Sequence, residues 1–175
     1  MKTSVRGHLP SKPVDVPIEP WWHPQIGCIT DDDMKSVTTA ERDLIDKLID
    51  SSGADSAGAF DYHCIHSLYR KGLIYLDVPI EKTDCVSVPP LEGFVMNRLM
   101  GDYLETLLYK VFVSLDDTTS VQELATLLQI DIEMAQRAVS MFCRLGFAHR
   151  KALDYDKLLQ HPSWREFYQV PMKRC

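Results

Sequence analysis

Apolar residues recur at helical spacing in two parts of the chain, and each part ends with a glycine and a β-like run. In the first part, the capping box Thr38-x-x-Glu41 starts a helix over residues 38–50. The apolar face of this helix consists of Leu44, Ile45, Leu48 and Ile49. After a loop or short helix, a second helix runs from Asp61 to Lys71, and Gly72 ends it as a C-terminal glycine commonly does. The run 73–78 then predicts a strand.

Residues 101–151 repeat this order more clearly. A helix begins at Asp102, the capping box Ser120-x-x-Glu123 starts a short second helix, and Asp131 caps a third. The third helix ends at Gly146, and a strand begins at residue 147. The residues expected to face inward are Leu104, Leu107, Leu108, Val111, Phe112, Leu115, Leu124, Ala125, Leu127, Leu128, Ala135, Ala138, Val139 and Phe142.

The two parts agree at an offset of 74 residues. The matching pairs are Ile65 with Val139, Leu68 with Phe142, Arg70 with Arg144, Gly72 with Gly146, and Leu73 with Phe147. The winged-helix variant of the helix-turn-helix has this order: a helix, a short helix, a long helix and then a β-strand. We therefore predict a mainly α fold with small β wings, arranged as tandem winged-helix-like modules, although the first module lacks a convincing middle helix.

This pattern divides the chain into five parts. They are a Pro-rich lead-in (1–37), a first winged-helix-like module (38–80), a connector (81–100), a second module (101–151) and a divergent tail (152–175). In the lead-in, prolines exclude a continuous helix, and the alternation of Val14, Val16 and Ile18 favours a strand edge or an extended polyproline-like path. Trp21 and Trp22 are expected to anchor it to the core, with a partner-binding platform as the alternative.

Composition places the chain among ordinary globular proteins. Of its 175 residues, 45% are hydrophobic and 25% are charged, with a net charge of -6. No apolar run is long enough for a membrane span, and the first twenty residues have no secretory apolar region. The five cysteines are widely spaced and form no CxxC pair, so we expect a reduced, intracellular environment.

A winged-helix order raises the possibility of DNA recognition by the third helix. That helix, however, carries Asp131 and Glu133 at its N-terminal end against Arg137 and Arg144. Only the pair Arg150-Lys151 adds positive charge beyond it. Because DNA affinity depends on basic residues that neutralise phosphates, we favour a protein-interaction use of the fold and keep a DNA-binding winged-helix regulator as the alternative.

Sequence motifs for catalysis or metal binding are weak. His63 and His66 could share an ion on one helix face, but no further Cys/His set completes the coordination. The run 31–33 of three aspartates lacks the glycine and glutamate of a calcium loop and fits the first turn of a short helix over 34–37. The phosphate-loop, dinucleotide and nucleophile-elbow motifs are missing. We predict no catalytic, metal or cofactor-binding residues, although a triad can assemble from distant positions.

The connector is unusually apolar for a loop. Its apolar residues are Leu91, Phe94, Val95 and Met96, followed by Arg98. They either strap the connector onto the modules or form an exposed docking loop for a partner. These five are the candidate partner-binding residues.

Several long runs resemble the family with sequence similarity 91. They are Ile74–Ile80, Val88–Arg98, Gly101–Lys110 and Cys143–His149, with Lys12-Pro13-Val14 leading to Trp21-Trp22. The resemblance implies a non-enzymatic scaffold, located in the cytoplasm at the trans-Golgi network and on vesicles, that helps to capture endosome-derived vesicles. It implies binding of a TBC-domain adaptor protein that links to golgins, and a complex with a WD-repeat subunit, without nucleic acid or direct membrane insertion.

The resemblance also sets expectations about extent. Members of the family have a long helical segment before the matching region and a large region after it. We therefore expect this chain to represent a short form of the N-terminal region, with a tail from Ala152 onward that departs from the family pattern.

Overall fold

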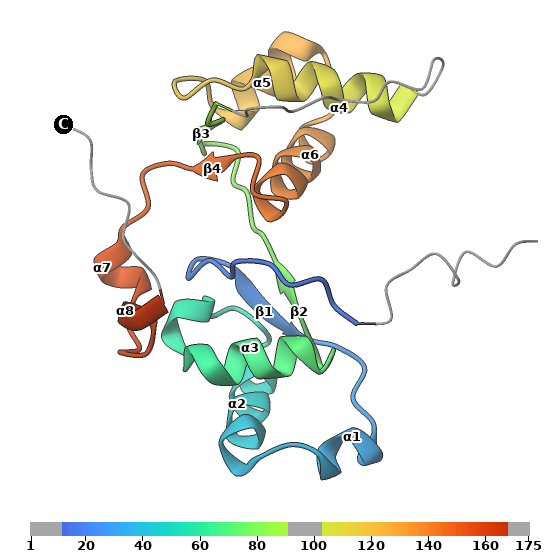
Figure 1. Cartoon of the computed structure of the whole chain (residues 1–175). Coiled ribbons are helices and arrows are strands. Elements are labelled where there is room, and N and C mark those ends of the chain that lie inside the picture. Colours follow the sequence, from blue (N-terminus) through green and yellow to red (C-terminus); the bar gives the residue numbers. More distant parts are fainter. Residues whose placement is uncertain (1–11, 91–102, 168–175) are drawn as a thin grey trace, which may run out of the picture. The chain divides into compact units, whose positions relative to one another are not determined.

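The chain forms two compact units, described here from a computed structural model that covers residues 12–90 and 103–167 (Figure 1). Unit 1 comprises the described residues up to Asp77 and those from Asp154 onward, and unit 2 comprises Val78–Leu153. About half of the structure is helical, with two small antiparallel two-stranded sheets. This confirms a mainly α fold with small β elements, while the winged-helix assignment stays a prediction.

Unit 1 is built on a pair of strands that lie far apart in the sequence. Its elements are β1 (His23–Ile26), α1 (Asp31–Lys35), α2 (Thr39–Asp50), a 3₁₀ helix (Ala57–Ala59), α3 (Tyr62–Arg70), β2 (Ile74–Asp77), α7 (Tyr155–Leu158) and α8 (Trp164–Phe167). Strands β1 and β2 pair antiparallel, from His23 opposite Asp77 to Ile26 opposite Ile74. Helix α2 packs on α3 and β1, and α3 packs on β2.

The lead-in enters this core through its tryptophans. Trp21 and Trp22 are buried, which confirms their predicted anchoring role. The strand expected across Val14 and Ile18 is wrong, because residues 12–19 carry no strand and pairing begins only at His23. Two prolines in this stretch lack the N–H that a ladder requires, so an extended path without ladder pairing results.

The tail completes unit 1. Trp164 is fully buried, and its Nε1 donates a hydrogen bond to the Phe60 carbonyl at 2.9 Å. The His161 amide donates to the Gly58 carbonyl at 3.0 Å. Gly58 itself faces the Leu158 carbonyl so closely that a Cβ would lie 1.9 Å from that oxygen. The tail therefore contributes to the same core as the lead-in.

The described elements of unit 2 begin and end with a strand. They are β3 (Val86–Ser87), α4 (Tyr103–Ser114), α5 (Val121–Leu128), α6 (Ile132–Arg144) and β4 (His149–Arg150). Strands β3 and β4 pair antiparallel, and the three helices pack on one another. Strand β3 forms within the stretch expected to be an irregular connector. The core centres on Val111, Leu124, Val139 and Phe142.

The predicted repeat is visible at the C-termini of α3 and α6. The Leu73 amide donates to the Leu68 carbonyl, and the Phe147 amide donates to the Phe142 carbonyl, in both cases reaching back five residues. Gly72 and Gly146, at φ +75° and +77°, occupy the left-handed conformation that this helix ending requires. The matched positions thus form the same ending in both units.

Some predicted helix boundaries and faces differ from the structure. Helix α1 begins at Asp31, capped by Thr30, rather than after the three aspartates. Ile49, Leu104 and Leu127 were expected to face inward, yet each is more than half exposed. Each of them lies at the edge of an apolar stripe, where helical spacing alone does not show how far the neighbouring element extends.

Candidate interaction surfaces

The docking loop predicted from the sequence lies outside the described residues. This holds for all five candidates: Leu91, Phe94, Val95, Met96 and Arg98. Their role stays a prediction. The described surfaces that could bind a partner are a hollow and a charged strand end in unit 2, and the outer face of α3 in unit 1.

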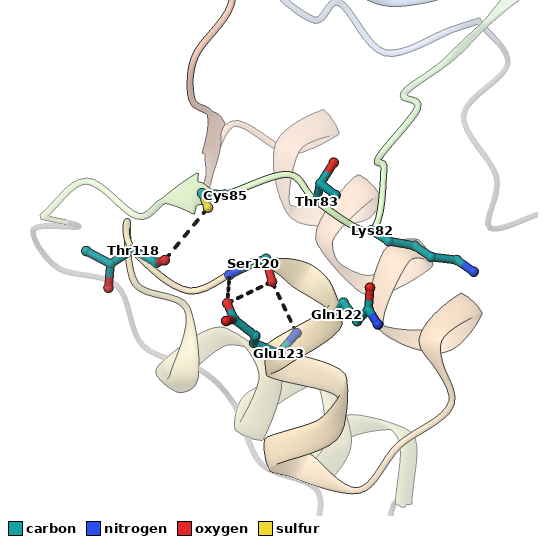
Figure 2. A pocket seen from close by; sticks show the side chains of 7 residues that line it. All are labelled: Lys82, Thr83, Cys85, Thr118, Ser120, Gln122 and Glu123. Atoms are coloured by element: carbon teal, nitrogen blue, oxygen red, sulfur yellow. Dashed lines mark hydrogen bonds between the residues drawn. The ribbon is translucent and has the colours of Figure 1, made fainter.

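Unit 2 has an open hollow of about 510 Å³ where the loop before β3 meets the start of α5 (Figure 2). It is lined by Lys82, Thr83, Cys85, Thr118, Ser120, Gln122 and Glu123. The Ser120 amide donates to the Glu123 carboxylate at 2.9 Å, and the Glu123 amide donates to Ser120 Oγ at 3.3 Å. Hydrogen bonds from the Ser120 amide and hydroxyl lower the pKa of Glu123.

This hollow is poorly suited to an anion. The first amides of α5 are already used, because Val121 donates to the Asp84 carbonyl and Gln122 donates to the Lys82 carbonyl. A phosphate would also meet the charged carboxylate of Glu123, which lies over the helix start (Figure 2). The hollow is therefore best explained as the junction that fixes the loop on α5.

Three basic residues that the sequence offered for DNA lie beside carboxylates. Arg150 contacts Asp84 at 2.8 Å, with both side chains largely buried. Lys151 forms an ion pair with Asp117, and its hydrogen bond lowers the pKa of that carboxyl. Arg137 pairs with Glu133 at 3.3 Å on the surface of α6. Arg150 is thus neutralised in a largely buried pair, whereas the exposed pair of Arg137 is held only weakly.

The polar side chains on α6 also serve internal contacts. Gln136 Nε2 donates to the Ile80 carbonyl at 2.6 Å, and Ser140 Oγ donates to the Val78 carbonyl at 2.7 Å. Gln136 is the only amide side chain of α6, and it holds the segment after β2. This use leaves α6 with little base-reading chemistry on the part of its surface that the structure describes.

The outer face of α3 carries contacts from both the lead-in and the tail. Near its C-terminal end, the Tyr69 hydroxyl donates to the Val14 carbonyl at 2.7 Å. The Asp15 carboxylate lies 3.4 Å from His66 Nε2 and 3.5 Å from the Arg70 guanidinium. Sequence reasoning missed these contacts because 51 to 55 residues separate the partners.

At the other end of α3, aromatic rings stack. Tyr62 stacks on His66 at 5.8 Å and on Phe167 of the tail at 4.6 Å between ring centroids. His63 meets the edge of Phe167 at 4.8 Å. Burial, together with the Asp15 carboxylate, raises the pKa of Tyr62.

A serine, a histidine and an aspartate meet where the tail joins α3, but not in a catalytic arrangement. His161 Nδ1 lies 2.8 Å from Ser163 Oγ, and the same nitrogen lies 3.7 Å from Asp61. A nucleophilic triad needs the serine and the carboxylate on opposite ring nitrogens. Ser163 Oγ also accepts the Tyr62 amide at 2.9 Å. The cluster therefore fastens the tail to the start of α3.

Neither a metal site nor a membrane span emerges from the part of the chain that the structure describes. Within residues 12–90 and 103–167, no group of three or more His, Cys, Asp or Glu side chains could hold an ion. In the same ranges, no helix combines the length and the apolar character needed to cross a membrane.

Comparison with known families gives one match over nearly the whole chain. The family model described as FAM91 N-terminus matches residues 1–165. The match includes residues 152–165, which we expected to depart from the family pattern, and agrees with the place of Trp164 in the core of unit 1. The chain therefore belongs to the FAM91 family and carries its N-terminal domain.

Proposed function

We propose that the chain is a non-enzymatic protein-interaction scaffold in the capture of endosome-derived vesicles at the trans-Golgi network. In this role it binds a TBC-domain adaptor that links to golgins, and it works in a complex with a WD-repeat subunit. Membership of the FAM91 family over residues 1–165 is the observation that carries the proposal. The proposed partners are those that the resemblance of the sequence runs to that family implies.

Two features of unit 2 support a protein partner over DNA. Its basic residues at β4 are neutralised by Asp84 and Asp117, so little charge is left for phosphates. Several large apolar side chains of unit 2 are more than half exposed and are therefore available to a protein partner. They are Tyr103, Val113, Leu127 and Leu145.

The first experiment measures capture of a purified TBC-domain adaptor by the immobilised chain, compared with Phe94→Ala and Ile49→Ala. Ile49 is the control because it is an exposed apolar residue of α2, outside both the loop and unit 2. We expect the wild-type chain and Ile49→Ala to capture the adaptor, and Phe94→Ala to lose capture while remaining folded.

Each other outcome has a definite meaning. Unfolding of Phe94→Ala assigns the loop to the core. Full capture by Phe94→Ala removes the loop from the interface and leaves the exposed apolar residues of unit 2 to be replaced in turn. Failure of the wild-type chain to capture the adaptor contradicts the proposed function.

A further inference from the structure

The outer face of α3 presents four side chains in one row, which we call the α3 strip. It consists of Tyr62, His66, Tyr69 and Arg70, spaced so that they share one side of the helix. None of the four is buried, although α3 as a whole is a core element of unit 1. One side of α3 thus packs in the core of unit 1, and the strip on its other side is an accessible polar and aromatic surface.

The lead-in lies on this strip as an extended peptide would. Its Val14 carbonyl accepts the Tyr69 hydroxyl, and its Asp15 carboxylate faces both His66 and Arg70. One hydrogen bond therefore fixes the backbone, and two basic side chains receive the adjacent carboxylate. The strip therefore binds a backbone carbonyl through Tyr69 and the acidic side chain that follows it through His66 and Arg70.

The lead-in is held weakly at this point. The Val14 side chain is 61% exposed and the Asp15 side chain 67% exposed, and both ion-pair distances are long. Exposed ion pairs of this kind contribute little to stability. Firm burial begins only at Ile18 and continues through the tryptophans. Release of Val14 and Asp15 from the strip would therefore expose little buried surface.

We propose that the α3 strip is a docking surface for an extended segment of a partner protein that carries an aspartate or glutamate, and that Val14-Asp15 is its internal competitor. Arg70, joined by His66 when it is protonated, gives the strip a local positive charge that is complementary to an acidic segment. The inference rests on the proposed scaffold function, but its test uses peptides alone. Failure here and failure of adaptor capture are therefore separate results.

The test uses the acetylated, amidated peptide Lys-Pro-Val-Asp-Val, which copies residues 12–16. It is titrated into the ¹⁵N-labelled full chain and followed by amide chemical shifts. We expect saturable shifts at the α3 strip, with binding to Asp15→Ala at least about fivefold tighter than to the wild-type chain, because the competitor is weakened. The double variant Asp15→Ala/Arg70→Ala should bind the peptide several-fold more weakly than Asp15→Ala.

The controls separate recognition from general charge attraction. Arg137→Ala, which removes a comparable surface arginine from α6, should leave peptide binding unchanged in the Asp15→Ala background. The same peptide with asparagine in place of aspartate should bind several-fold more weakly. Absence of shifts at the strip in Asp15→Ala, equal binding of the asparagine peptide, or equal shifts from heparin would each overturn the proposal.

Discussion

A buried carboxylate distinguishes the two capping boxes that look alike in the sequence. Thr38-x-x-Glu41 and Ser120-x-x-Glu123 both form the reciprocal hydrogen bonds of the motif. Glu41, however, is only 3% exposed, and it also accepts from Lys71 at 2.8 Å and from Ser67 at 2.5 Å. These partners come from α3 and its end, so Glu41 ties the start of one helix to the end of another.

We expect Glu41→Gln to destabilise the chain by about 1–3 kcal/mol, since the substitution leaves Lys71 without its partly buried counter-charge. Glu123→Gln changes the matching box without such a partner and should have a much smaller effect. Urea unfolding followed by circular dichroism compares the two variants. Equal losses of stability would show that the capping box, rather than the ion pair, accounts for the contribution of Glu41.

The same carboxylate gives a pH dependence. Burial by itself would raise the pKa of Glu41, but hydrogen bonds from Lys71, Ser67 and Thr38 outweigh it and hold the pKa at about 2, below the ordinary value of 4.5. A pKa lowered by folding means that the carboxylate stabilises the protein above pH 4.5, and that this contribution is lost as the pH falls toward 2.

Stability measured at pH 7, 4 and 3 should therefore show the gap between the wild-type chain and Glu41→Gln narrowing as the pH falls. The comparison between variants cancels the other carboxylates that titrate in this range, such as Asp61 and Asp116. A gap that stays constant from pH 7 to pH 3 would contradict this assignment.

At the scale of elements, local signals predicted the helices well and long-range contacts poorly. The residues that start and end α2, α3, α5 and α6 lie within a few positions of one another, so capping boxes and terminal glycines identify them. The pairing of β1 with β2 joins segments about fifty residues apart, and Pro24 makes β1 an unusual strand.

At the outer face of α3, too, the sequence predicted the local structure and missed the long-range contacts. The α3 helix was predicted, but the contacts of Val14 and Asp15 with its outer face were not, because an exposed Asp in a lead-in has no local signature of its partner. The tail was missed for a similar reason. A tryptophan at position 164 gives no sign in the sequence that Phe60 receives its hydrogen bond.

Two glycines of unit 1 should respond differently to alanine. In Gly72→Ala the new Cβ meets nothing within 4 Å, so only the left-handed φ of +75° opposes it, at about 1 kcal/mol. In Gly58→Ala the Cβ would lie 1.9 Å from the Leu158 carbonyl oxygen, so the tail must move. We expect this variant to lose about 2 kcal/mol or more.

Limited trypsin digestion distinguishes the two variants, because a displaced tail frees the backbone around Lys157 and Arg165, whose side chains are already exposed. Gly58→Ala should be cleaved in the tail faster than either the wild-type chain or Gly72→Ala. Equal cleavage of all three would show that the tail does not depend on its close approach to Gly58.

For the whole molecule, the decisive property is how its positive charge is placed. The net charge is -6, and three basic residues of unit 2 lie beside carboxylates: Arg137 on α6, Arg150 in β4 and Lys151 after it. Attraction to a polyanion needs several cations that can release counterions from phosphates or sulfates. A chain with its positive charge distributed in this way should bind proteins through local surfaces and should have little affinity for nucleic acid.

The wild-type chain should therefore flow through heparin at about 0.15 M salt, where exposed charges are screened within about 8 Å. The double variant Asp117→Asn/Glu133→Gln removes the carboxylate partners of Lys151 and Arg137. It should therefore elute from the heparin column later than the wild-type chain. Asp43→Asn/Asp46→Asn is the matched control, because it changes the net charge equally on α2 without unmasking either cation. Retention of the wild-type chain would favour the DNA-binding alternative. Equal delay of both double variants would mean that net charge, and not the pairing at α6 and β4, keeps the protein from polyanions.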